Sequence, residues 1–165
     1  MVQTTYGYNT PIGQAGGLYD LSPVKIDAFI NEAATGALKF GMGCVQGTLV
    51  GNGVTVPVAA STAAKFEGIV VNRRTTENDD EGVPVLKNKR TVGVLRYGRI
   101  YGLLAEGAEP EYGGAVYLMV KGDEAGCFTD SAGTNSDAIL IKGAKFLSGP
   151  VDGLAVIDLL DQEHA

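Results

Sequence analysis

Short apolar runs rich in Val, Ile, Tyr and Phe recur along most of the chain and are separated by clusters of Gly, Asn and Asp. None of the runs after residue 36 has the 3.6-residue period of an amphipathic helix. Short strands separated by turn signals are typical of a closed barrel or a sandwich. The pattern therefore predicts one all-β domain of short antiparallel strands over residues 36–165. The runs cover residues 37–47, 53–59, 65–73, 83–87, 90–105, 113–122, 126–130, 137–149 and 154–162.

Residues 1–35 have a different composition, rich in Gly, Pro, Asn and Tyr, with neither a helical period nor much alternation. Such a segment cannot easily build a core of its own, so we predict an extended N-terminal arm. Its tyrosines, Tyr6, Tyr8 and Tyr19, are expected to pack onto another surface. The end of the segment, residues 22–36, is ambiguous: Ser-Pro at its start is typical of a helix N-terminus, but its alternating apolar residues favour extended structure.

The stretch KFGMGCVQGT, residues 39–48, carries three closely spaced glycines that suit either a phosphate-binding loop or a strand. A dinucleotide loop needs G-x-G-x-x-G between a strand and a helix. Here the spacing is G-x-G-x-x-x-G, a β-like run follows, and the Lys-Ser/Thr pair of a P-loop is missing. Glycine inside a strand marks a bulge, a bend or a close backbone approach. The sequence therefore predicts a strand here and no phosphate-bearing cofactor.

The charge balance argues against nucleic acid as a partner. Thirteen Lys and Arg stand against nineteen Asp and Glu, a net charge of −6, and the basic residues are dispersed. Nucleic-acid binders usually carry a basic face, because neutralising phosphates supplies much of their affinity. No apolar run approaches the roughly 18 residues of a membrane span, and the first residues do not read as a signal peptide. We expect no membrane partner and synthesis in a cytoplasm.

Few residues are available for catalysis or for metal binding. The single histidine is His164, which removes Ser-His-Asp and Cys-His systems and every multi-histidine metal site. Cys44 and Cys127 have no C-x-x-C spacing and are expected to be buried thiols. The sequence thus predicts a protein that is not an enzyme and that binds no metal or cofactor.

An acidic stretch, TTENDDEGVPVLKN at residues 75–88, imitates the first half of an EF-hand calcium loop. Glu77, Asp79 and Glu81 have the alternating spacing of calcium ligands. The twelfth position is Asn88, where a bidentate Glu is required, and no flanking helices are indicated. An exposed acidic loop between strands is the better interpretation.

The stretch RTVGVLRYGRIYG, residues 90–102, interleaves arginine with tyrosine. Such residues can bind single-stranded nucleic acid by stacking, but they are also typical of protein–protein hot spots. The acidic total favours the second interpretation, and Arg96 and Tyr97 would lie on opposite faces of a strand rather than on one platform. We therefore predict a subunit or partner interface that includes Arg96, Arg99 and Tyr101.

Three elements occur in order between residue 13 and residue 47: GQAGGLYD, SPVKIDAFINEA and FGMGCVQG. Followed by a glycine-punctuated β domain, they resemble the capsid cement, or decoration, proteins of tailed bacteriophages. The resemblance implies a small β-barrel or tulip-like domain that forms homodimers or homotrimers on the outer capsid surface of the virion. There it would bridge neighbouring major capsid protein subunits after the shell expands.

On this hypothesis the arm lies on the capsid or on neighbouring subunits. An alternative role for its tyrosines is packing within the domain itself. The first alternative function is a carbohydrate- or host-surface-binding β-module of a phage virion, for which Tyr112 and Tyr117 could supply aromatic surface, although Trp is absent. A carboxylate-dependent hydrolase ranks last, because no catalytic constellation is recognisable. The expected contact residues of the arm are Tyr6, Tyr8, Pro11, Tyr19 and Pro23.

Overall fold

The computed structural model describes residues 13–73 and 77–160, and this part of the chain is all-β, as the sequence pattern predicts. It holds nine strands and a single 3₁₀ turn, Ala63–Lys65, and no helix in it is long and apolar enough to cross a membrane. The strands are β1 Lys25–Asn31, β2 Gly43–Gln46, β3 Gly53–Thr55, β4 Phe66–Val70, β5 Thr91–Leu103, β6 Ala115–Met119, β7 Phe128–Thr129, β8 Ala138–Phe146 and β9 Leu154–Leu159.

Five strands close into a barrel in the order β1-β3-β2-β4-β5, with β5 pairing back onto β1. All the pairings are antiparallel except that of β1 with β3, which is parallel. The β1–β3 contact is also a short seam, because only Ile30 and Asn31 have partners in β3. The predicted closed barrel is therefore confirmed, with one weakly paired side.

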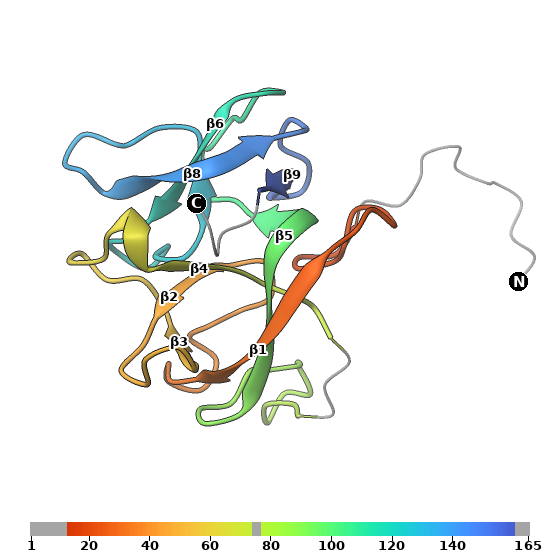
Figure 1. Ribbon diagram of the computed structural model, residues 1–165, viewed down its shortest axis with the longest axis vertical. Helices are drawn as coiled ribbons and strands as arrows, with labels where there is room; N and C mark the ends of the chain where they lie inside the picture. The colour runs from red at the N-terminus through yellow and green to blue at the C-terminus, as the bar shows by residue number, and fades with distance from the viewer. Residues whose placement is uncertain (1–12, 74–76, 161–165) are drawn as a thin grey trace, which may run out of the picture.

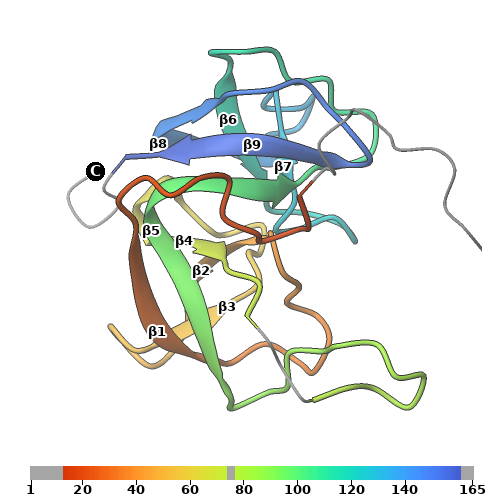
Figure 2. The same ribbon diagram turned by 90° about the vertical axis from the view of Figure 1, so that its right-hand side faces the viewer.

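A second group of strands extends the sheet from the far half of β5 in the order β9-β8-β6-β7. Phe128 of β7 forms a parallel bridge with Leu104, the residue directly after β5. The last strand of the second group therefore contacts the end of β5, and the second group nearly closes as well. In Figure 1 the barrel lies below and the second group above, and Figure 2 shows β5 running through both. The 13 residues of β5 are thus the spine of the molecule.

The buried side chains form two clusters. One includes Phe29, Val54 and Val94 of the barrel strands, and the larger one joins Phe128 and Phe146 of the second group to barrel residues such as Phe66. Burial of apolar surface contributes about 25 cal/mol per Å², and it is the main stabilising term for these packed strands.

The glycine-rich stretch at residues 39–48 forms β2 and the turn before it, so the strand interpretation is confirmed. A Cβ atom at Gly43 would clash with Leu118 and lie 2.9 Å from the Phe128 ring. Glycine is needed here because the barrel and the second group approach each other at this point. The ambiguous segment at residues 22–36 is also extended, since it contains β1.

Candidate interaction surface

Residues 13–24, which we call the strap, run beside β5 on the edge that β9 leaves open. The N–H of Gly16 donates to the carbonyl of Tyr101 at 2.8 Å, and the N–H of Tyr19 donates to the carbonyl of Arg99 at 3.0 Å. The strap then leads directly into β1. Described residues of the predicted arm therefore pair with the barrel, while Tyr6, Tyr8 and Pro11 lie outside the described residues.

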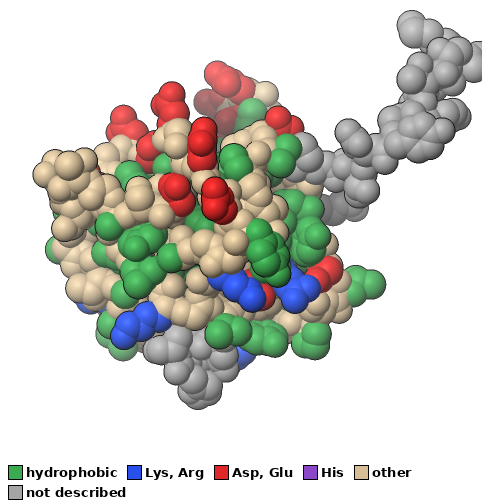
Figure 3. All heavy atoms as spheres, turned by 90° about the horizontal axis from the view of Figure 1, so that it is seen from above, with side chains coloured by type: hydrophobic (Ala, Val, Ile, Leu, Met, Phe, Trp, Pro, Cys, Tyr) green, Lys and Arg blue, Asp and Glu red, His purple; other side chains and the backbone are tan. Residues whose placement is uncertain are grey.

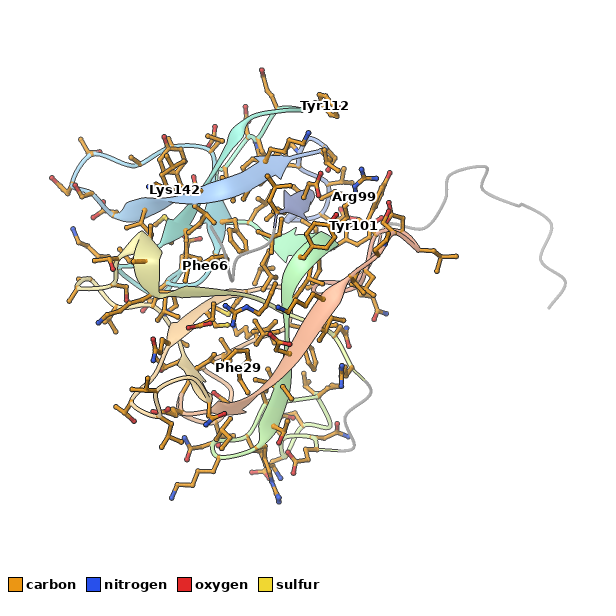
Figure 4. All side chains as sticks on the ribbon, in the orientation of Figure 1. Phe29, Phe66, Arg99, Tyr101, Tyr112 and Lys142 are labelled. Carbon is orange, nitrogen blue, oxygen red and sulfur yellow. The ribbon has the colours of Figure 1, made fainter. Side chains whose placement is uncertain are left out.

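Aromatic packing fixes the strap further. The rings of Tyr19 and Tyr101 meet edge to face, with 5.7 Å between centroids. The Tyr101 ring also lies against Gly13, where any side chain would collide with it. Figure 4 shows Tyr101 beside Arg99, whereas Tyr112 lies at the top of the molecule, away from this cluster. An edge-to-face pair adds roughly 0.5–1.5 kcal/mol beyond area burial, so the contact helps to hold the strap.

An ion pair joins the strap to β5 and β9. A guanidinium N–H of Arg99 donates to Asp20 at 2.9 Å, and its Nε lies 3.8 Å from Asp158. The pKa of Asp20 is lowered, first by the hydroxyl of Ser22 and also by Arg99. The Asp20 carboxylate is therefore charged at neutral pH and orients both the strap turn and the arginine, whose side chain stays 40% exposed.

Large apolar side chains of the strap remain uncovered by the rest of the described chain. Leu21 is fully exposed, Tyr19 is about half exposed, and Leu18 and Val24 are 40% and 38% exposed. Tyr97 on β5, which pairs with Lys25 directly after the strap, is 39% exposed. Several exposed apolar side chains on one short segment mark interaction sites more often than isolated ones do. We call these five residues the apolar row.

Arg96 lies elsewhere, on the barrel side of β5. Its guanidinium is 2.7 Å from Glu67 of β4, 3.7 Å from Asp27 of β1, and 5.7 Å above the centre of the Phe29 ring. Only 13% of its side chain is exposed. Arg96 thus links β5 to β4 and β1, at a part of β1 that does not pair with β3. Its part in an interface stays a prediction.

Of the predicted contact residues, the structure brings Tyr19, Arg99 and Tyr101 together, with Pro23 exposed near the end of the strap. The members of this surface that the sequence did not single out are Leu18, Leu21, Val24 and Tyr97. The available signal was an apolar residue, Leu21, in a segment with no periodicity that could bury it.

Among the described residues, the charged side chains do not gather into a ligand-binding site. In the view of Figure 3, acidic side chains gather on one side of the face and Lys and Arg on the other. In the acidic stretch, the Asp79 carboxylate accepts the N–H groups of Glu81 and Val83 at 2.9 and 2.8 Å, so it caps its own turn. Across residues 13–73 and 77–160, no three His, Cys, Asp or Glu side chains form a group that could hold a metal ion.

Comparison with known proteins identifies both a family and a similar solved structure. The model of a family described as structural cement protein (E217 gp24/Pam3 gp6) matches residues 2–160. A chain in a solved structure entitled "The capsid of Myoviridae Phage XM1" has a similar fold, with a TM-score of 0.72 over 96% of each chain at 17% identity. No curated protein matches the chain. At this low identity the structural match shows the shared fold, whereas the family model spans nearly the whole sequence.

Proposed function

The chain belongs to the phage structural cement protein family, and from this premise we propose that it binds the outside of the expanded capsid and bridges neighbouring major capsid protein subunits. Membership confirms the resemblance noted in the N-terminal part of the sequence. The family is a structural one, and the proposed role requires no catalysis. The protein would be made in the host cytoplasm and act in the virion.

The apolar row is the observation that supports this role most directly. It presents Leu21 and Tyr19 on a segment fixed to β5 by backbone hydrogen bonds, with Arg99 beside them. Aromatic and apolar anchors next to an arginine are the composition of binding hot spots. Because the strap is attached before binding, little further ordering cost falls on the complex. We assign the apolar row as the surface that meets the major capsid protein.

Bridging also requires contact beyond one site. The arm residues Tyr6, Tyr8 and Pro11 precede the strap, so they would reach past the apolar row to the capsid or to another copy of the protein. A homodimer or homotrimer would hold several apolar rows at once, and multivalent attachment raises avidity without stronger single contacts. A shell with many equivalent sites suits this arrangement.

The test is co-sedimentation of the purified protein with expanded capsids that lack it. We expect saturable binding at a fixed ratio to the major capsid protein. Leu21→Glu should weaken binding strongly, because a carboxylate would be desolvated at the centre of the contact. Val58→Glu, at another exposed apolar position, is the matched control and should bind as the native protein does.

Equal binding by Leu21→Glu and Val58→Glu would refute the assignment of the apolar row. Absence of any saturable binding to capsids would refute the cement role itself. In that case retention of the protein on glycans or host cell surfaces, lost on Tyr112→Ala, would favour the carbohydrate-binding alternative.

A further inference from the structure

Among the described residues, one edge of β1 is left without a partner strand over most of its length. This strand pairs with β5 from Lys25 to Ile30 but with β3 only at its last two residues. The Asn31 N–H donates toward the β5 side, to Arg90 at 2.8 Å, and the Ile30 N–H donates the other way, to Asn52 at 2.8 Å. Because the directions alternate along a strand, the N–H and C=O of Ala28 point away from β5, where no described strand receives them.

A fixed apolar loop stands beside this edge. Both carboxylate oxygens of Glu32 cap the loop at residues 48–52: one accepts the N–H and hydroxyl of Thr48, and the other accepts the N–H of Leu49 at 2.8 Å. Leu49 is 49% and Val50 81% exposed on the loop that this carboxylate holds. Two large aliphatic side chains that stay exposed on a loop held in place are typical of a contact with a partner.

The edge and the loop enclose a shallow groove with a volume of about 420 Å³. The residues that line it include Ala28, Ile30, Leu49, Val50 and Asn52. A groove that offers unpaired backbone groups along one side and aliphatic side chains along the other suits an extended strand with one apolar face.

The N-terminal residues have the pattern of such a strand. From residue 2 to residue 10 the chain reads VQTTYGYNT, so Val2, Tyr6 and Tyr8 share one face with two threonines, and Gln, Thr, Gly and Asn share the other. Val, Thr and Tyr are all favoured in strands. The spacing places the tyrosines two residues apart, as neighbours on one face of a strand.

The number of residues in the arm determines whether it can reach the groove of its own chain. Gly13 lies against Tyr101, and Ala28 pairs with Gly93, which comes eight residues before Tyr101 in β5. At about 3.3 Å per residue that separation is roughly 26 Å along the strand, so a chain running back from residue 13 would use about eight residues to cover it. Only residues 1–4 would remain for the groove, and both tyrosines would fall short. The arm of another copy has no such limit.

We propose that residues 2–10 of one copy add as a strand to the free edge of β1 in a neighbouring copy, with Tyr6 and Tyr8 packed over Leu49 and Val50. This inference rests on the proposed role of the arm as a contact between subunits. It names the receiving site, which the family match does not provide.

Disulfide cross-linking between chains tests the proposal directly. Ala28→Cys protein is mixed with ¹⁵N-labelled Thr4→Cys or Thr10→Cys protein, oxidised mildly, and digested for mass spectrometry. Position 28 and the even arm positions share the outer face, so we expect linked 28–4 or 28–10 peptides between labelled and unlabelled chains. Thr5→Cys, on the opposite face, is the control and should give about tenfold less product, because its side chain points away from position 28 and the two sulfurs cannot reach bonding geometry.

The native cysteines give little background. Burial raises the pKa of Cys44 far above its usual value and that of Cys127 to about 11, so both thiols stay protonated at pH 8. Links confined to one chain in a Thr4→Cys, Ala28→Cys double variant would overturn the proposal in favour of the protein's own arm. No product above that of native protein would overturn it outright.

Sedimentation velocity provides a second measurement that needs no engineered cysteine. Ala28→Pro removes the outward N–H and leaves the β1–β5 ladder intact, because that N–H does not point toward β5. We expect this variant and a deletion of residues 2–10 to lose self-association to the same degree, with unchanged circular dichroism. Full self-association of either one would contradict the proposal, whereas capsid co-sedimentation is scored separately and tests only the cement role.

Discussion

Replacing Gly16 by alanine should release the strap from β5. Gly16 has φ +74°, and a Cβ atom there would lie 2.6 Å from the carbonyl oxygen of Val70 and 2.7 Å from the N–H nitrogen of Asn72. Its own N–H and carbonyl are both used, in bonds of 2.8 Å to Tyr101 and 2.7 Å from Asn72. The backbone atoms around it cannot move aside without breaking the pairing of the strap.

Two contributions set the size of the effect. A left-handed backbone costs an alanine about 1 kcal/mol. Loss of the two hydrogen bonds of Gly16 adds about 1 kcal/mol each, for a total near 3 kcal/mol in the free energy of unfolding. Gly107 has the same φ of +74° but nothing within 4 Å of its Cβ position, so Gly107→Ala isolates the backbone cost of about 1 kcal/mol.

Urea unfolding followed by circular dichroism measures both variants. With an m-value of about 2 kcal/mol/M, the midpoint should fall by about 1.5 M for Gly16→Ala and about 0.5 M for Gly107→Ala. Only Gly16→Ala should also lose capsid binding, because it displaces the apolar row. Equal midpoints for the two variants, or full capsid binding by Gly16→Ala, would refute the view that the strap is clamped at this residue.

Three further predictions concern the barrel. Arg96→Met should cost about 3 kcal/mol, since it leaves the Glu67 carboxylate, 14% exposed, without its partner; Arg96→Met with Glu67→Leu should recover most of this in urea unfolding. Hydrogen bonds led by the Thr48 hydroxyl lower the pKa of Glu32, so its contribution to stability is present above pH 4.5 and is lost as pH falls; Glu32→Gln should flatten that acid limb of the urea midpoint. Burial raises the pKa of Cys44, so stability should decline above about pH 9, and Cys44→Ala should reduce this alkaline loss to the part that the raised pKa of Cys127 contributes.

The sequence was sufficient for the class of fold because strand patterning is local. Alternating apolar residues at 24–30 predicted extended structure, and β1 lies there. Likewise, the spacing of the glycines at 41, 43 and 47 does not fit a dinucleotide loop. Local spacing and composition decided both points, so no long-range information was required.

The strap was not predictable, because its partners are far away in sequence. Tyr19 pairs with Arg99 from the other half of the chain, and nothing near Tyr19 indicates that edge of β5. For the same reason, the sequence alone does not show that Arg96 and Arg99 have different surroundings. Alternation places neighbouring side chains on opposite faces of β5, but only the fold brings Glu67 beside Arg96 and Asp20 beside Arg99.

The central claim is that the protein strengthens the phage shell, and the rupture temperature of expanded capsids tests it most directly. Capsids lacking the protein are titrated with it and heated, and release of their contents is followed by fluorescence. A ligand that binds only the intact shell stabilises it in proportion to occupancy. We expect a rupture temperature that rises with bound protein and levels off at saturation. Saturated binding with an unchanged rupture temperature would contradict the claim.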